Sequence, residues 1–173
     1  QLGDQRVAAI MTPRPDIVAI RSDATVDDLR RLFFVNESSR PAVYTDNIDN
    51  IAGLIVVKDL IQMTDAPAGH RKVAELMRPA SFVPETKRVA DLLRELQQKR
   101  TQLAIVVDEY GGTAGLVTVE DVVEELVGEI RDEYDSEADP IVHEGAETYV
   151  FSAKVRISAL VDRLGVDHGT ALT

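Results

Sequence analysis

An internal repeat constrains this chain more than any other feature of its sequence. Four segments recur in the same order 62 to 66 positions later, so the offset drifts by only four residues. The pairs are Met11-Thr12-Pro13 with Met77-Arg78-Pro79, Val26 and Leu29 with Val89 and Leu92, Pro41-Ala42-Val43 with Ala104-Ile105-Val106, and Gly53 to Asp59 with Gly115 to Asp121. We therefore expect two related units that differ mainly in the length of their loops.

Each unit has the pattern strand, helix, strand, strand, helix. In the first unit the predicted strands are 17–20, 42–44 and 51–56, with helices beginning at Thr25, through a capping box, and at Lys58. In the second unit a leucine stripe predicts a helix from Val89, followed by strands at 103–107 and 115–118 and a helix over about 119–130. One unit alone leaves a sheet face exposed. The predicted fold is therefore α/β, with the two units packed sheet to sheet about a pseudo-two-fold axis.

Composition excludes several classes of function. The 173 residues include 19 basic and 30 acidic side chains, for a net charge of −11, and no cysteine. This excludes disulfide scaffolds, thiolate zinc sites and cysteine nucleophiles. Residues 120–139 alone hold ten acidic side chains and one arginine. We expect no nucleic-acid partner, because such partners need a basic surface. The acidic run is either a solvated helix face and linker or a set of oxygen ligands for Mg²⁺, and its metal binding is left open.

No catalytic group is apparent. His70, His143 and His168 lie in predicted loops without the spacing of a metal site or a catalytic triad. The chain also lacks a glycine-rich phosphate loop ending in lysine. We therefore expect that this chain is not an enzyme.

The segment from Gly115 to Asp121 carries the strongest binding signal. A predicted strand ends at Thr118 where a helix begins, so backbone amides there could face an anion, the Thr118 hydroxyl could bind a phosphate or sugar oxygen, and Asp121 could accept from ribose hydroxyls. The alternative is a helix capping box without a ligand, the form that Thr25 also begins. In the first unit Val56 replaces the threonine but Asp59 remains, which favours a ligand over a simple cap.

The paired units, with Gly-hydrophobic-hydrophobic-Thr-x-x-Asp at their ends, resemble tandem cystathionine-β-synthase (CBS) domains, which bind adenosine nucleotides in the clefts between them. Further motifs resemble the CorC/HlyC (cyclin M-like) group of magnesium and cobalt efflux proteins. These motifs are Met11-Thr12-Pro13-Arg14, Val57-Lys58-Asp59-Leu60, Asp108-Glu109-Tyr110-Gly111-Gly112, Glu124-Glu125, Gly128-Glu129-Ile130 and Asp132-Glu133-Tyr134-Asp135. The resemblance covers roughly residues 6–165.

This resemblance implies a domain organisation. The expected parts are a lead-in segment (1–9), CBS domain 1 (10–66), a linker (67–72), CBS domain 2 (73–131), an acidic linker (132–140) and the start of a truncated transporter-associated domain (141–173). In the last part, Thr148 to Phe151 is a predicted strand and Ile157 to Leu164 a predicted helix closed by Gly165.

The resemblance also implies site residues. Asp121 would take the ribose hydroxyls, Thr118 a phosphate or sugar oxygen, Thr12 and Ile17 the adenine side, and Arg40 the phosphates. Ser38 stands where relatives often have an aromatic residue, which predicts weaker stacking. Since Val56 lacks a hydroxyl, we expect one nucleotide per pair.

The predicted function is regulatory binding of ATP, or of ADP or AMP, with Mg²⁺, coupled to magnesium or cobalt efflux. The expected partners are a second copy of the chain, in a homodimer, and a membrane ion-transport domain or transporter. The expected location is cytoplasmic, either as a free module or as the cytosolic portion of an inner-membrane protein. One alternative is a ligand-free dimerisation scaffold of the same transport system. A weaker one is an enzymatic role through the C-terminal domain, which distantly resembles flavin-binding folds.

Overall fold

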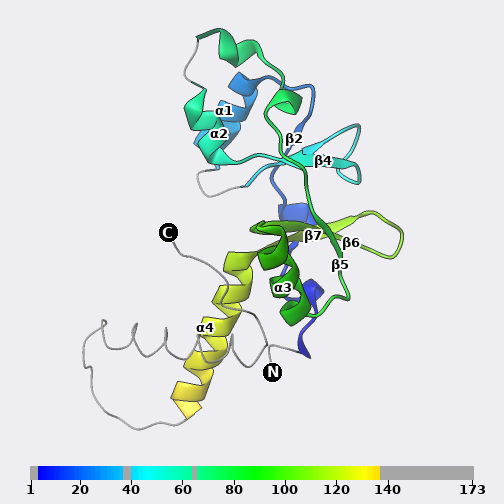
Figure 1. The fold of residues 1–173 in the computed structure, drawn as a ribbon, viewed down its shortest axis with the longest axis vertical. Coiled ribbons are helices and arrows are strands. Elements are labelled where there is room, and N and C mark those ends of the chain that lie inside the picture. The colour runs from blue at the N-terminus through cyan, green and yellow to red at the C-terminus, as the bar shows by residue number, and fades with distance from the viewer. Residues whose placement is uncertain (1–3, 37–39, 64–65, 137–173) are drawn as a thin grey trace, which may run out of the picture. The chain divides into compact units, whose positions relative to one another are not determined.

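The computed structural model describes residues 4–36, 40–63 and 66–136 (Figure 1). The main elements are β1 (Thr12–Pro13), β2 (Ala19–Arg21), α1 (Val26–Val35), β3 (Ala42–Tyr44), β4 (Ile51–Leu54), α2 (Val57–Gln62), β5 (Phe82–Pro84), α3 (Val89–Lys99), β6 (Leu103–Val107), β7 (Thr113–Thr118) and α4 (Val119–Ser136). The order confirms the strand-helix-strand-strand-helix pattern of both repeats and the α/β class. The strand and helix expected beyond residue 140 lie outside the described residues.

Element ends differ from the predictions for local reasons. The strand expected at 17–20 begins at Ala19, because a 3-10 turn (Arg14–Asp16) precedes it and the Ile17 amide donates to the Arg14 carbonyl at 3.2 Å. The strand expected to reach residue 56 ends at Leu54, since Val56 is already the N-cap of α2. α4 continues to Ser136, past the predicted end near residue 130.

The described residues form two compact units that do not follow the repeat boundaries. One unit holds 11–85 and 103–117, and therefore β1 to β6, α1, α2 and all of β7 except its last residue, Thr118. The other holds the segment before residue 11, residues 86–102 and the chain from Thr118 onwards, which includes α3 and α4.

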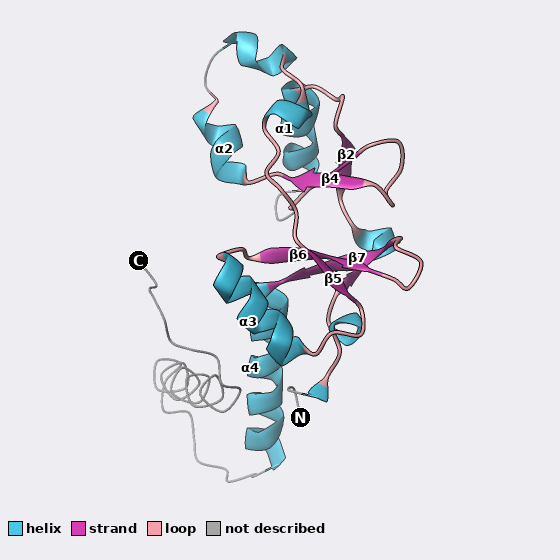
Figure 2. Ribbon diagram, turned by 45° about the vertical axis from the view of Figure 1, so that its right-hand side comes forward, coloured by secondary structure: helices cyan, strands magenta, loops and turns pink. Residues whose placement is uncertain are grey.

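In the first of these units, three strands in the order β2-β3-β4 form one sheet, with β2 parallel and β4 antiparallel to β3. Helices α1 and α2 cover one face of this sheet (Figure 2). The core between them is apolar and consists of Ile20, Val26, Leu29, Val43, Ile55, Leu60 and Val73. Helix α1 begins here because Thr25 caps it and because Val26 and Leu29 point into this core.

The second sheet of the same unit has the order β1-β7-β6-β5. A second core cluster joins β3 to β6 and β7 and consists of Ala42, Leu103, Ile105 and Leu116. These residues come from both repeats. The sheet-to-sheet packing expected from the sequence is therefore confirmed.

Each repeat gives its first segment to the last strand of the other repeat. Thr12 pairs with Leu116, and Arg78 pairs with Leu54 through two backbone hydrogen bonds of 2.9 Å. A Cβ atom on Gly115 would lie 2.4 Å from the Thr12 carbonyl oxygen, and one on Gly53 would lie 2.6 Å from that of Arg78. Glycine is therefore needed at both positions because another backbone approaches so closely.

In the other unit, α3 buries Val89, Leu92, Leu93 and Leu96 and makes contacts with α4. The N-terminal segment lies beside the start of α3, since the Val7 amide donates to the Lys87 carbonyl at 2.8 Å. Helix α3 ends at Arg100, which has a left-handed backbone with φ of 53°. The helix stripe predicted from the leucines is confirmed.

Candidate functional site

Thr118 and Asp121 lie together at the junction of β7 and α4. The Thr118 amide donates to Oδ2 of Asp121 at 2.8 Å, and the Asp121 amide donates to Oγ1 of Thr118 at 3.1 Å. This reciprocal pair is a capping box. It leaves the hydroxyl proton of Thr118 available as a donor, and among the described residues Oδ1 of Asp121 accepts no hydrogen bond. The junction can therefore still offer a ligand one donor and one charged acceptor.

Fewer backbone amides at the start of α4 are free to bind an anion than the sequence suggested. The Val119 amide donates to the Gln102 carbonyl at 2.9 Å, and that of Asp121 is used by Thr118. Any recognition of an anion at this junction therefore depends on the side chains more than on a row of exposed N–H groups.

The same box occurs at the start of α1. The Thr25 amide donates to Oδ2 of Asp28 at 3.0 Å, and the Asp28 amide donates to Oγ1 of Thr25 at 3.2 Å. Hydrogen bonds from Thr25 hold the pKa of Asp28 below its ordinary value. Because this pair has no predicted ligand, the box geometry alone does not distinguish a binding site from a helix cap.

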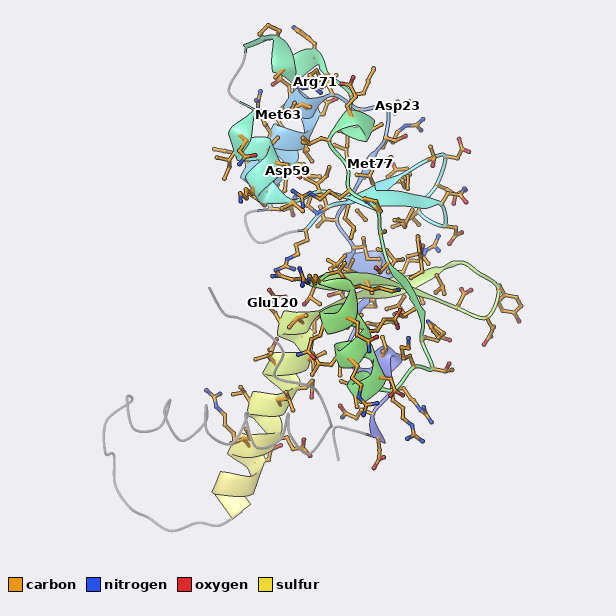
Figure 3. All side chains as sticks on the ribbon, in the orientation of Figure 1. Asp23, Asp59, Met63, Arg71, Met77 and Glu120 are labelled. Atoms are coloured by element: carbon orange, nitrogen blue, oxygen red, sulfur yellow. The ribbon has the colours of Figure 1, made fainter. Side chains whose placement is uncertain are left out.

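The repeat-related position on α2 is arranged differently. Val56 is the N-cap and has no side chain that could cap the helix. Both carboxylate oxygens of Asp59, which is labelled in Figure 3, instead accept from Arg78, at 2.6 Å from Nε and 2.7 Å from Nη2. The hydrogen bond from Arg78 holds the pKa of Asp59 below its ordinary value. An internal ion pair with Arg78 thus explains why the first repeat has Asp59 although Val56 replaces the threonine. From the sequence alone, only a ligand was considered for this aspartate.

The other predicted site residues lie in the unit that contains the two sheets. Thr12 is half-buried in β1. Ile17 precedes β2, and part of its side chain packs against the core between the sheets. Arg40 is half-buried just before the buried Pro41, and its side chain is not without a partner. Ser38 lies outside the described residues.

Sequence reasoning missed Arg78 and a second arginine, Arg14. The Arg14 guanidinium pairs with Asp49 and donates to the Thr113 carbonyl at 3.1 Å. This ties the β3–β4 loop to the start of β7, since the Thr113 hydroxyl also donates to the Ile48 carbonyl at 2.7 Å. The repeat held one signal for Arg78, because the second repeat has a cation where the first has Thr12, and the first repeat has Val56 in place of the capping threonine. Nothing local in the sequence pointed to the pairing of Arg14.

Two further properties concern metals and membranes. Within residues 4–36, 40–63 and 66–136, no group of three or more histidine or carboxylate side chains could hold a metal ion. In the same ranges, no helix has the length and apolar character needed to cross a bilayer. The acidic run continues to residue 139, past the end of the described residues.

Comparison with known proteins identifies the family. The model of the CBS domain matches residues 7–64 and again residues 73–128. The chain belongs to the CBS-domain family. The two matches agree with the repeat and make it a CBS-domain pair.

This CBS-domain pair is most informatively compared with proteins of the CorC group. It is 43% identical over 137 residues to the magnesium and cobalt efflux protein CorC of Pasteurella multocida, which covers 79% of this chain and 46% of that protein. It is 39% identical over 157 residues to hemolysin C of Brachyspira hyodysenteriae, covering 91% of this chain and 58% of that protein. The chain therefore spans about half the length of these curated relatives.

One solved structure is similar to the pair in both fold and sequence. It is the CBS domain of the bacterial CNNM/CorC family Mg²⁺ transporter in complex with ATP, with 45% identity and a TM-score of 0.70. The likeness covers 73% of this chain and 90% of that one. The expected resemblance to the CorC/HlyC group is thus confirmed.

Proposed function

We propose that this CBS-domain pair is a regulatory module that binds an adenine nucleotide, ATP with Mg²⁺, and controls magnesium or cobalt efflux. The observation that carries this proposal is the junction at Thr118 and Asp121, which offers a hydroxyl donor and a carboxylate acceptor even while it caps α4. The ATP complex of a CBS domain that is 45% identical supports the choice of ligand.

The chemistry of ribose and phosphate fits this junction. Oδ1 of Asp121 would accept from the ribose hydroxyls, and the Thr118 hydroxyl would donate to a phosphate or sugar oxygen. Thr12 and Ile17 would contact the adenine and Arg40 the phosphates, as the resemblance to the family implies. Mg²⁺ would be coordinated by the nucleotide phosphates rather than by a set of protein ligands alone, because Mg²⁺ keeps several waters and often binds through substrate phosphates.

Regulation requires a difference in affinity. Bound nucleotide would favour one arrangement of the chain over another, and it can do so only as far as its affinities for the two arrangements differ. That change would pass to an ion-transport domain on the same or another chain. No covalent bond is made or broken, and we place the module on the cytosolic side, where ATP is available.

The two capping boxes provide a matched test. Titration calorimetry with ATP, with and without Mg²⁺, is compared for the parent chain, Asp121→Ala and Asp28→Ala. Both substitutions remove the acidic member of a box. Only Asp121→Ala is expected to weaken ATP binding, by at least ~10-fold, since a hydrogen bond to a charged group contributes about 1.5–3 kcal/mol. Equal ATP affinities in all three proteins would overturn the assignment of the site. Arms with ADP and AMP establish which nucleotide is preferred.

A ligand-free dimerisation scaffold is the second candidate. Phe34 and Val35 at the end of α1, and Ile61 on α2, are 88%, 78% and 70% exposed, which is unusual for such large apolar side chains. We propose that these side chains contribute to a homodimer. A melting temperature unchanged by excess ATP and Mg²⁺, with a dimer that Val35→Asp dissociates, would favour the scaffold, because any ligand of the folded state must raise the melting temperature.

A further inference from the structure

Arg78 and Thr12 occupy equivalent positions in the two repeats. Each is the middle residue of a Met-x-Pro segment. Each also pairs with the last strand of the other repeat, Arg78 with Leu54 and Thr12 with Leu116. The two positions are thus equivalent in structure as well as in the repeat. The effect of arginine at one and threonine at the other can therefore be compared directly.

Arg78 neutralises and occupies the carboxylate that corresponds to Asp121. Its two nitrogens bind both oxygens of Asp59, whose side chain is only 19% exposed. The guanidinium balances the charge of this carboxylate and uses both of its oxygens, so sugar hydroxyls would have to displace a bidentate, charge-assisted pair. Threonine at the equivalent position, Thr12, has no cationic group with which to form such a pair.

We propose that Arg78 is an internal occupant of the first repeat's nucleotide position, and that it limits the chain to one nucleotide. This inference rests on the proposed function and deepens it. Val56 removes the hydroxyl from that position, and Arg78 removes the carboxylate. The first repeat therefore keeps the position of a second adenine-nucleotide site, but its own residues prevent binding there. Both Val56 and Arg78 must change before a nucleotide can bind.

The decisive variant restores the residues of the other repeat at both positions. We compare the number of ATP molecules bound per chain for the parent, for Val56→Thr/Arg78→Thr and for Arg21→Thr. Arg21 is the matched control, because it forms an exposed two-point pair with Asp23 in the same unit, at 3.0 and 3.2 Å. The expected result is one nucleotide for the parent and for Arg21→Thr, and two for the double variant.

The outcomes separate this inference from the proposed function. One nucleotide in a folded Val56→Thr/Arg78→Thr protein overturns the role of Arg78. If the parent binds none and the double variant binds one, the inference stands and the assignment at Asp121 fails. If neither binds, both fail. Loss of the parent's single site in Arg78→Thr also overturns the inference, because Arg78 would then be a phosphate contact.

A second variant keeps the test valid if the double variant does not fold. Asp59→Asn preserves the shape of the side chain but removes the charge that holds Arg78. Since Asp59 is already occupied, its change should leave ATP affinity within about twofold of the parent, a difference below half a kilocalorie per mole. A tenfold loss would show that Asp59 contacts the nucleotide and would overturn the inference.

Discussion

Substitution of Gly115 by alanine tests the exchange of strands between the two repeats. The added Cβ would lie 2.4 Å from the Thr12 carbonyl oxygen and 2.7 Å from Sδ of Met11, whereas ordinary contacts begin near 3.4 Å. β1 must therefore move by about 1 Å, which overpacks the contact at a cost of ~1–3 kcal/mol and weakens the hydrogen bonds of a two-residue strand. We expect the free energy of unfolding to fall by ~2–3 kcal/mol, or the melting temperature by about 4–12 °C.

The control is Gly128→Ala in α4, where an added Cβ meets no atom within 4 Å. Since glycine in a helix interior is less stable than alanine, this variant should be more stable than the parent by ~0.5–1 kcal/mol. Urea unfolding followed by circular dichroism measures both. If Gly115→Ala is as stable as the parent while Gly128→Ala shows its expected gain, the close approach of β1 to β7 is refuted.

Two further predictions concern charge and core. Glu95 accepts hydrogen bonds from Lys87 and Lys99, which hold its pKa below the ordinary value, so this stabilisation is present above about pH 4.5 and is lost as the pH falls through the folded-state pKa. Glu95→Gln should therefore be less stable than the parent at pH 7, and the difference should shrink as the pH falls below about 4.5; a difference independent of pH contradicts this. Leu29→Ala, at a fully buried position, should cost ~2–5 kcal/mol in denaturant unfolding, whereas Tyr110→Ala, at an 89% exposed position, should stay within about 0.5 kcal/mol, and similar costs for the two would contradict the burial pattern.

Local patterns predicted the elements of this fold well because the same order of strands and helices occurs in both repeats. The capping box at Thr25 fixed the start of α1, and the apolar run at 103–107 matches β6 residue for residue. These features depend on neighbours within a few positions along the chain. The sequence therefore contains the physical information that determines them.

Long-range pairing could not be predicted in the same way. Nothing near Thr12 indicates that its partner is Leu116, since strand register between distant segments depends on tertiary packing. The ion pair of Asp59 with Arg78 was missed for the same reason. Thr118 and Asp121 were proposed as site residues from their motif, and the structure shows that they cap α4.

The exchange of first segments between repeats also determines how long each segment waits for its partner during translation. Arg78 follows its partner Leu54 by 24 residues, but Leu116 follows Thr12 by 104. At about 5–20 residues per second, a ribosome needs roughly 5–20 s to deliver the strand on which β1 pairs. For that interval the nascent first repeat has no lasting partner for its opening strand, and it is accessible to chaperones and proteases. Slow codons between residues 12 and 116 would lengthen this interval without changing a single contact of the finished protein.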